Sequence, residues 1–245
     1  MKLGQTARKA ISAYGGIELW ENMNLIEAEV SARGLAITLK RRQLFDHAKI
    51  KMDIRKPFSK LAPIGKRKHI AGVLDGQNVW LENKKGQTIT ERSNARQFFP
   101  FGRRLFYWDD LDMAYFANYA FWNYFTLPHL LMNEDIEWSE KPGSVLKARF
   151  PASIPTHNES QEFHFDPKTG RLIQHNYTAN VIGRMAKAAN VVAKHSEIGG
   201  LVYPSSRIVT PRNKSGTALK RPILIDIAVH DYKLTDSEEK DSTSI

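Results

Sequence analysis

The chain has 245 residues, of which 42% are hydrophobic, so it is long enough to bury a sizeable core. It contains no cysteine, which excludes disulfides, a thiol nucleophile, cysteine-type zinc sites and a lipid-attachment cysteine. Lysine and arginine outnumber aspartate and glutamate by 36 to 26, and this basic balance favours anionic partners or solubility without deciding between them. We predict one domain over residues 1–234 and a disordered acidic tail over residues 235–245, because the tail is polar and poor in apolar residues.

The N-terminal sequence MKLGQTARKAISAYGG carries positive charges but no long apolar run. A secretory signal peptide needs such a run, so we expect a cytoplasmic protein whose contact with membranes is at most peripheral. Residues 113–131 approach the length of a transmembrane helix. Burying their polar groups in lipid would be costly, so we expect no transmembrane helix. The interrupting residues are Asn118, Asn123, Thr126, Pro128 and His129.

The first third of the chain combines one helical pattern with several strand patterns. Residues 5–22 place apolar side chains at helical spacing, with a break at Gly15 and Gly16. Apolar and polar residues then alternate, as is typical of half-buried strands. This alternation predicts strands at residues 25–32, 35–41, 45–54, 70–74, 79–82 and 87–92, with a hairpin turn at Asp75-Gly76.

The run YFANYAFWNYF, residues 115–125, is aromatic at seven of its eleven positions, and these side chains point to every side of a helix. A helix that is apolar all round must be buried in protein or lipid. We predict such a helix from about Asp110 to Leu127. Asp109, Asp110 and Asp112 precede or open it, and we interpret them as helix caps in preference to an acidic catalytic or metal cluster.

The strand pattern resumes after this helix, and DPKTG at residues 166–170 is a strong hairpin signal. Further strands are predicted at residues 134–139, 145–150, 161–165, 172–179, 190–195, 201–210 and 223–234. About a dozen strands with two substantial helices indicate an α+β fold. We expect one long curled antiparallel sheet, an open half-barrel that covers the aromatic helix, plus the N-terminal helix.

Several short motifs are spread over nearly the whole chain. They are AYGG (13–16) with Trp20, WDDL (108–111), YAFWNY (119–124), FD (165–166) with GRL (170–172), HNYTA (175–179), and GLVYP (200–204) with Arg207. Together with the order of elements, they resemble the lipoprotein-localisation fold, the open half-barrel with a helical lid of bacterial lipoprotein carrier and receptor proteins. They resemble more closely an uncharacterised bacterial family related to these proteins in fold.

This resemblance implies a hydrophobic cavity between curved sheet and helical lid, which holds acyl chains in the carrier proteins. The present chain lacks a lipid-attachment cysteine and a recognisable signal peptide. We therefore expect the hydrophobic cavity that the resemblance implies, but we do not expect the bound molecule to be a lipoprotein on the strength of this resemblance.

The leading functional hypothesis is a non-enzymatic protein that binds an apolar or amphipathic, lipid-like molecule between the sheet and the aromatic helix. Such sites are mostly apolar with a few polar anchors. We expect no cofactor. The residues expected to bind the ligand are Tyr115, Tyr119, Trp122 and Asn123 on the helix and His175, Tyr177 and Arg207 on the sheet.

The alternative is a cofactor-independent enzyme, such as an isomerase, cyclase or hydrolase, that acts on an apolar substrate in the same cavity. It requires a titratable pair, and neighbouring strands could bring His175, Tyr177 and His195 together for proton transfer. The competing interpretation is a histidine hydrogen-bonded in the core. We find no metal-ligand spacing, phosphate-binding glycine loop or nucleophile elbow, and we predict no metal site.

A basic segment, Arg55–His69, mixes cations with Phe58, Leu61 and Ile64. As a surface loop, it could rest on an anionic membrane with these three side chains inserted shallowly. An ordinary solvated loop is the competing interpretation. We do not expect nucleic-acid binding, because no recognised binding motif accompanies the charge.

Overall fold

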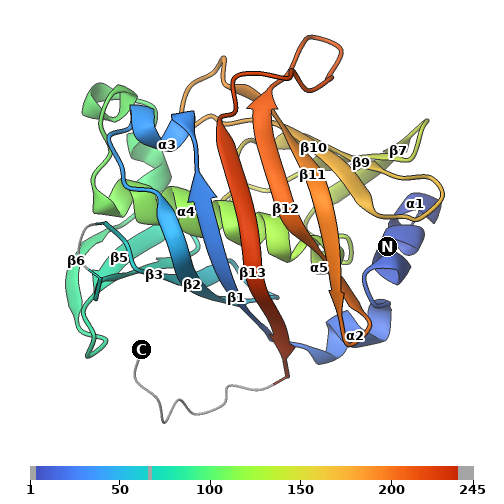
Figure 1. Cartoon of the computed structure of the whole chain (residues 1–245), viewed down its shortest axis with the longest axis horizontal. Helices are drawn as coiled ribbons and strands as arrows, with labels where there is room; N and C mark the ends of the chain where they lie inside the picture. The colour runs from blue at the N-terminus through green and yellow to red at the C-terminus, as the bar shows by residue number, and fades with distance from the viewer. Residues whose placement is uncertain (1–3, 66–67, 237–245) are drawn as a thin grey trace.

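The structure, a computed structural model, describes residues 4–65 and 68–236. Its α-helices are α1 (Gln5–Ala13), α2 (Ile17–Asn22), α3 (Leu35–Leu39), α4 (Asp110–Phe125) and α5 (Leu127–Leu130), and its 3₁₀ helices are η1 (Ala95–Phe98) and η2 (Gly102–Leu105). The strands are β1 (Leu25–Arg33), β2 (Phe45–Asp53), β3 (Phe58–Ala62), β4 (Ala71–Asp75), β5 (Asn78–Glu82), β6 (Thr88–Arg92), β7 (Glu137–Lys141), β8 (Val145–Arg149), β9 (Ser160–Phe165), β10 (Leu172–Thr178), β11 (Lys187–Ile198), β12 (Leu201–Pro211) and β13 (Ile225–Thr235) (Figure 1). Most of the predicted acidic tail, residues 237–245, lies outside the described residues.

All thirteen strands belong to one antiparallel sheet with the order β6-β5-β4-β3-β2-β1-β13-β12-β11-β10-β9-β8-β7. Neighbours in this sheet are also neighbours in sequence, except that β1 pairs with β13. The predictions of one long antiparallel sheet and an N-terminal helix are therefore confirmed. As expected of an open half-barrel, the sheet does not close, and β6 and β7 form its edges. The expected curl is found only in part, because the sheet is not strongly curled. It bends locally instead, at register shifts such as those in the pairs β1–β2 and β11–β12.

The alternation in residues 35–41 predicts a strand, but this segment contains helix α3. Gly34 explains the difference. Its φ is 139°, and a Cβ added to it would lie 2.4 Å from the carbonyl oxygen of Leu224, so a side chain cannot be accommodated. The chain turns out of β1 at this glycine and buries Ile37 from a short helix. A short apolar run is compatible with a helix as well as with a strand, so the alternation in residues 35–41 predicted a strand incorrectly.

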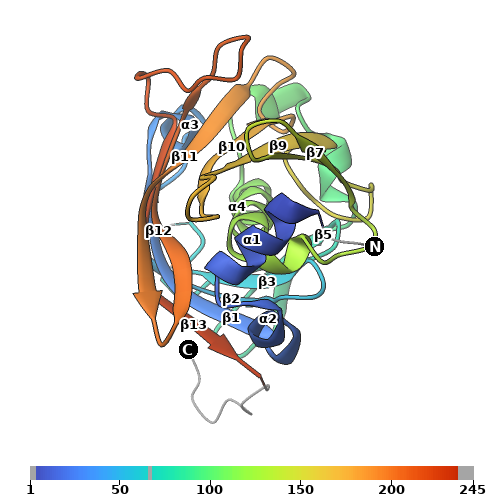
Figure 2. The ribbon, with the colours of Figure 1, turned by 90° about the vertical axis from the view of Figure 1, so that its right-hand side faces the viewer.

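The predicted aromatic helix is confirmed as α4, which lies on one face of the sheet (Figure 2). Every residue from Leu111 to Phe125 is buried. The helix packs closely on strands β3, β4 and β5. Its buried amide Asn118 is satisfied, because Nδ2 donates to the carbonyl oxygens of Gly72 and Ala114 and Oδ1 accepts from Ser59. Both polar atoms of the Asn118 side chain therefore have hydrogen-bond partners, although the helix is fully buried.

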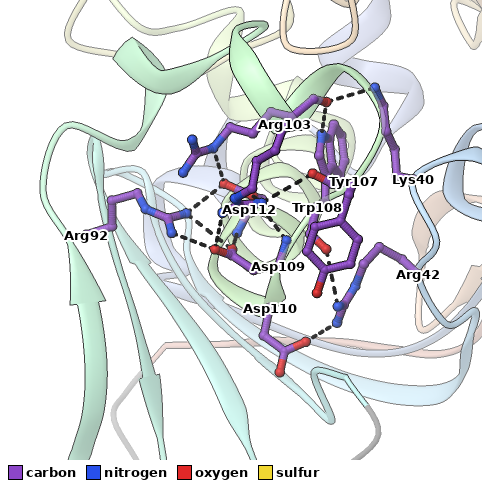
Figure 3. A network of polar contacts seen from close by, with 10 residues as sticks. Lys40, Arg42, Arg92, Arg103, Tyr107, Trp108, Asp109, Asp110 and Asp112 are labelled. Atoms are coloured by element: carbon purple, nitrogen blue, oxygen red, sulfur yellow. Dashed lines mark hydrogen bonds and ion pairs between the residues drawn. The ribbon is translucent and has the colours of Figure 1, made fainter.

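The start of α4 is fixed by a capping box, as the sequence predicts (Figure 3). Oδ1 of Asp109 accepts a hydrogen bond from the backbone N–H of Asp112 at 2.7 Å, and Oδ2 of Asp112 accepts one from the N–H of Asp109 at 3.1 Å. These bonds satisfy N–H groups that have no partner within the helix. The two carboxylates also place negative charge at the positive end of the helix dipole.

Three arginines surround the Asp112 carboxylate, whose side chain is 0% exposed. Arg92 and Arg104 donate to Oδ1, each at 2.6 Å, and Arg103 donates to Oδ2 at 2.8 Å. Arg92 and Arg103 also pair with Asp109. This network ties the segment of residues 93–108, which contains η1 and η2, to the first turn of α4 (Figure 3).

We expect Asp112→Asn to lower the free energy of unfolding by roughly 3–5 kcal/mol, because it removes a buried charge and leaves three arginines partly unpaired. The measurement is urea denaturation. The matched control is Glu159→Gln, which removes a carboxylate that is 61% exposed and pairs with Arg149, itself 65% exposed, and its expected cost is below about 1 kcal/mol. An equal loss in both variants would contradict the assigned importance of the buried network.

Asp109 also makes the stability depend on pH. Burial raises the pKa of its carboxyl, but the hydrogen bonds from Arg92 and Asp112 and the charges of Arg92 and Arg103 outweigh this and lower the pKa to about 2. A pKa below the unfolded value of 3.8 contributes stability that is present above pH 3.8 and lost as pH falls toward 2.

Asp109→Asn keeps a capping side chain without the charge. We expect the Asp109→Asn variant to have a free energy of unfolding lower than that of the native chain by on the order of 1–2 kcal/mol at pH 5. In acid-unfolding curves, this difference between variant and native chain should vanish near pH 2. A difference that does not change with pH would refute the assignment of the low pKa to Asp109.

Candidate functional site

A cavity of about 580 Å³ lies between the sheet, the first half of α4 and a cover made by α3 and η2. This volume is within the range of small-molecule sites. Its walls are predominantly apolar, and its charged side chains are all cationic. The lining residues are Ala36, Leu39, Lys40, Arg41, Leu105, Phe106, Phe116, His157, Tyr177, Ala179, Ile182, Met185, Ala186, Lys187, Ala188, Val209, Pro211, Leu224 and Ile225.

Lys40 holds the cover of the cavity together. Its Nζ donates to the carbonyl oxygens of Arg104 and Leu105, at 3.0 and 2.8 Å, at the end of η2. The Lys40 side chain also packs over the ring of Trp108, with Nζ 5.4 Å from the ring centre. Burial lowers the pKa of Lys40. Helix α3 and η2, which are far apart in sequence, are thereby joined above the cavity.

The inner wall of the cavity contains a hydrogen-bonded cluster of His157, Tyr124 and Tyr177. The hydroxyl of Tyr124 lies 2.8 Å from Nε2 of His157 and 2.8 Å from the hydroxyl of Tyr177. The rings of His157 and Tyr177 stack, with centres 3.7 Å apart. Two of these side chains, His157 and Tyr177, border the cavity, so the cluster presents polar groups at the inner end of an apolar space.

The cluster is electrically neutral. Burial, together with the charge of Arg96, holds the pKa of His157 well below its usual value. Burial likewise raises the pKa of Tyr177 well above its usual value. Arg96 also donates to the carbonyl oxygen of His157 at 2.9 Å and so fixes the backbone at that residue. Both ring nitrogens of His157 are already bonded, to Tyr119 and Tyr124, so the Tyr177 hydroxyl is the group of this cluster at the cavity wall that can still hydrogen-bond a ligand. A neutral cluster cannot neutralise a charged ligand.

Sequence reasoning missed His157. It lies in the irregular segment between β8 and β9, where no helical or strand periodicity marks which side chains point inward. Its burial, with 1% of its surface exposed, follows from contacts with α4 and β10 that are distant in sequence. No local signal identifies such a residue.

The four predicted ligand-binding residues of α4 are buried but do not border this cavity. The Tyr115 hydroxyl donates to Gln77, the Trp122 indole donates to the carbonyl of Asp53, and Asn123 donates to the carbonyls of Tyr119 and Pro155. The Tyr119 hydroxyl lies 3.3 Å from Nδ1 of His157, directly behind the cluster. From α4, Phe116 forms part of the cavity wall.

The three predicted ligand-binding residues of the sheet occupy different positions. Tyr177 borders the cavity. His175 is buried beside it and bonds through Nε2 to Oε1 of Gln161 at 2.5 Å. Arg207 is 1% exposed and donates from Nη2 to the carbonyl oxygen of Tyr124 at 2.9 Å, while its Nε and Nη1 have no hydrogen-bond partner among the described residues.

His195 is not part of this cluster. In the pair β10–β11, His175 lies opposite Asn190, so His195 falls beyond the paired part of β10. Its Nε2 bonds instead to the hydroxyl of Tyr14, at 2.9 Å. The structure therefore places the rings of His175 and Tyr177 side by side, with centres 4.9 Å apart, but leaves His195 outside this pair.

A second hollow, of about 610 Å³, lies between the turn that contains Gln77 and the segment before β9. Its wall includes Arg149, which pairs with both Glu137 and Glu159. The wall also contains Arg96 and Asp135, so this hollow presents a strongly charged surface of mixed sign, which suits an apolar ligand less well than the first cavity does. We therefore take the apolar cavity as the candidate site.

The segment Arg55–His69 is not the apolar surface loop that its membrane hypothesis requires. It contains Phe58–Ala62, which is strand β3 between β2 and β4. Leu61 and Ile64 are both 0% exposed and cannot insert into lipid. This part of the hypothesis is wrong, because a short strand buries alternate side chains whether or not cations flank it. Residues 66–67 of the segment lie outside the described residues.

Residues 4–65 and 68–236 contain no group of three or more histidine, aspartate or glutamate side chains close enough to hold a metal ion. No helix within these residues is both long and apolar enough to cross a bilayer.

Comparisons with known proteins bear on the fold. No protein-family model matches the chain, and no curated protein matches it. The chain is similar to the solved structure of a LolA superfamily protein from Nitrosomonas europaea, with a TM-score of 0.51 and 14% identity over 98% of this chain and 96% of that one. It is also similar to a putative outer membrane lipoprotein-sorting protein domain from Vibrio parahaemolyticus, with a TM-score of 0.51 and 11% identity over 96% and 93% of the two chains. The chain therefore has a LolA-like fold, and the resemblance inferred from its motifs is confirmed at the level of structure.

Proposed function

We propose that the protein binds an apolar or amphipathic, lipid-like molecule in the cavity between the sheet, α4 and the cover of α3 and η2. The observation that carries this proposal is the cavity itself, with a volume of about 580 Å³ and predominantly apolar walls. Burial of an apolar ligand there gains roughly 25 cal/mol for each Å² removed from water. The LolA-like fold supports the same class of ligand, since one neighbour is described as a lipoprotein-sorting protein.

The polar groups of the cavity favour an amphipathic ligand. His157 and Tyr177 lie at the inner wall, and Lys40, Arg41 and Lys187 lie near the cover. An apolar chain would fill the space between them, with an uncharged polar group at the inner wall or an anionic group at the cover. Tyr177 is the predicted ligand-binding residue that would contact the ligand directly. Tyr119 and His175 would hold this inner wall in place from behind.

We expect Ala186→Trp to weaken ligand binding at least tenfold, because Ala186 borders the cavity and an indole there occupies the space of the ligand. Binding is measured by titration with a fluorescent fatty acid, and native mass spectrometry of the purified chain tests for a co-purified lipid. The matched control is Ala152→Trp, which fills part of the second hollow.

The control variant should bind the fluorescent fatty acid as the native chain does. Equal binding by both variants would place the ligand outside the cavity. No uptake and no co-purified lipid in the native chain would refute the proposed function.

A further inference from the structure

Four segments that border the cavity share an unusual composition. They are residues 34–44, 93–108, 179–188 and 211–224, called here the mouth segments, and each contributes residues to the cavity lining. Together they contain twelve lysines and arginines and no aspartate or glutamate. Since the formal charge of the whole chain is +10, the remainder of the chain is slightly acidic. The mouth segments lie along the upper edge of the molecule in Figure 1, so the excess positive charge is concentrated at one end of the fold.

Some of these cations are already compensated inside the protein. Arg42 pairs with Asp110, and Arg103 and Arg104 pair with Asp112. Six others are exposed and form no ion pair among the described residues: Arg41, Arg184, Lys187, Lys214, Lys220 and Arg221. No carboxylate in the mouth segments opposes them, so this surface attracts an anionic partner.

The same segments expose large apolar side chains. Of the fourteen large hydrophobic residues that are exposed in the described chain, ten belong to the mouth segments: Leu35, Leu39, Leu44, Phe98, Phe101, Leu105, Phe106, Tyr107, Met185 and Leu219. Phe106 is 71% exposed and Met185 is 92% exposed, and both border the cavity. Apolar surface concentrated in this way marks an interaction site, whereas single exposed hydrophobic residues are ordinary.

We propose that the mouth segments dock onto an anionic lipid bilayer, with their exposed apolar side chains at the headgroup–acyl boundary and their free cations among the headgroups. Each cation near such a surface contributes on the order of 1 kcal/mol, and the apolar side chains add the burial of their surface. A bilayer matches both features at once, because it offers dispersed negative charge above an apolar layer. Docking in this way brings the entrance of the cavity to the membrane surface, and it replaces the contact expected through Arg55–His69.

The test is co-sedimentation with vesicles of phosphatidylcholine alone and of phosphatidylcholine mixed equally with phosphatidylglycerol. The native chain should bind the mixed vesicles, and binding should weaken as salt rises. Arg184→Glu with Lys220→Glu should reduce this binding at least tenfold. The matched control is Lys84→Glu with Lys85→Glu, an equal change of charge on the exposed turn between β5 and β6, and it should bind as the native chain does.

A second pair of variants tests the apolar contribution. Phe101→Ser with Leu219→Ser should weaken vesicle binding even at high salt, and Ile89→Ser with Ile198→Ser, two exposed residues outside the mouth segments, should not. None of these eight residues borders the cavity, so uptake of the fluorescent fatty acid in vesicle-free solution reports separately on the proposed function. Equal losses in test and control variants would overturn the proposal. So would binding of polyglutamate without binding of anionic vesicles, which would assign the surface to an acidic protein.

Discussion

Helix α4 carries apolar side chains on all of its sides, and its need for enclosure governs how the rest of the chain is arranged. Every residue from Leu111 to Phe125 is buried, so protein has to surround the helix wherever water would otherwise reach it. The sheet provides most of this enclosure, and the irregular segment that contains His157 adds to it from another side. A cavity arises where α3 and η2 cover the remaining space without filling it. The candidate site is thus a by-product of how the chain encloses one helix.

A buried helix also has to satisfy the partial charges at its two ends. Asp109 and Asp112 do this at the start of α4. Arg207 does it at the other end, where it donates to the carbonyl oxygen of Tyr124 and lies with its guanidinium carbon 5.1 Å from the centre of the Tyr124 ring. Burial lowers the pKa of Arg207, and the titratable groups that oppose this shift are tyrosines. The negative end of the helix dipole and the face of an aromatic ring therefore take the place of a carboxylate.

Local patterns were sufficient to predict α4, its caps and most strands, because capping chemistry and alternation are properties of neighbouring residues. They were insufficient for α3, where the constraint comes from Gly34 against the distant Leu224. The aromatic side chains of α4 predicted burial correctly, but they could not show which of them would face a cavity, since they point in every direction. That choice depends on the placement of η2 by Lys40, a contact across more than sixty residues of sequence.

The pairing of β1 with β13 has a consequence for biosynthesis. Strands β1 to β6 form one succession of neighbours, and strands β7 to β13 form another. Within the described residues, one strand pair joins these two halves of the sheet, β1 with β13, from Leu25 opposite Thr235 to Arg33 opposite Asp226. A ribosome makes β1 roughly two hundred residues before β13. Until then β1, which is central in the finished sheet, has one unpaired edge, and α4 lacks part of its cover. The nascent chain therefore leaves this edge of β1 open to strand addition by other chains until β13 has emerged and paired with it.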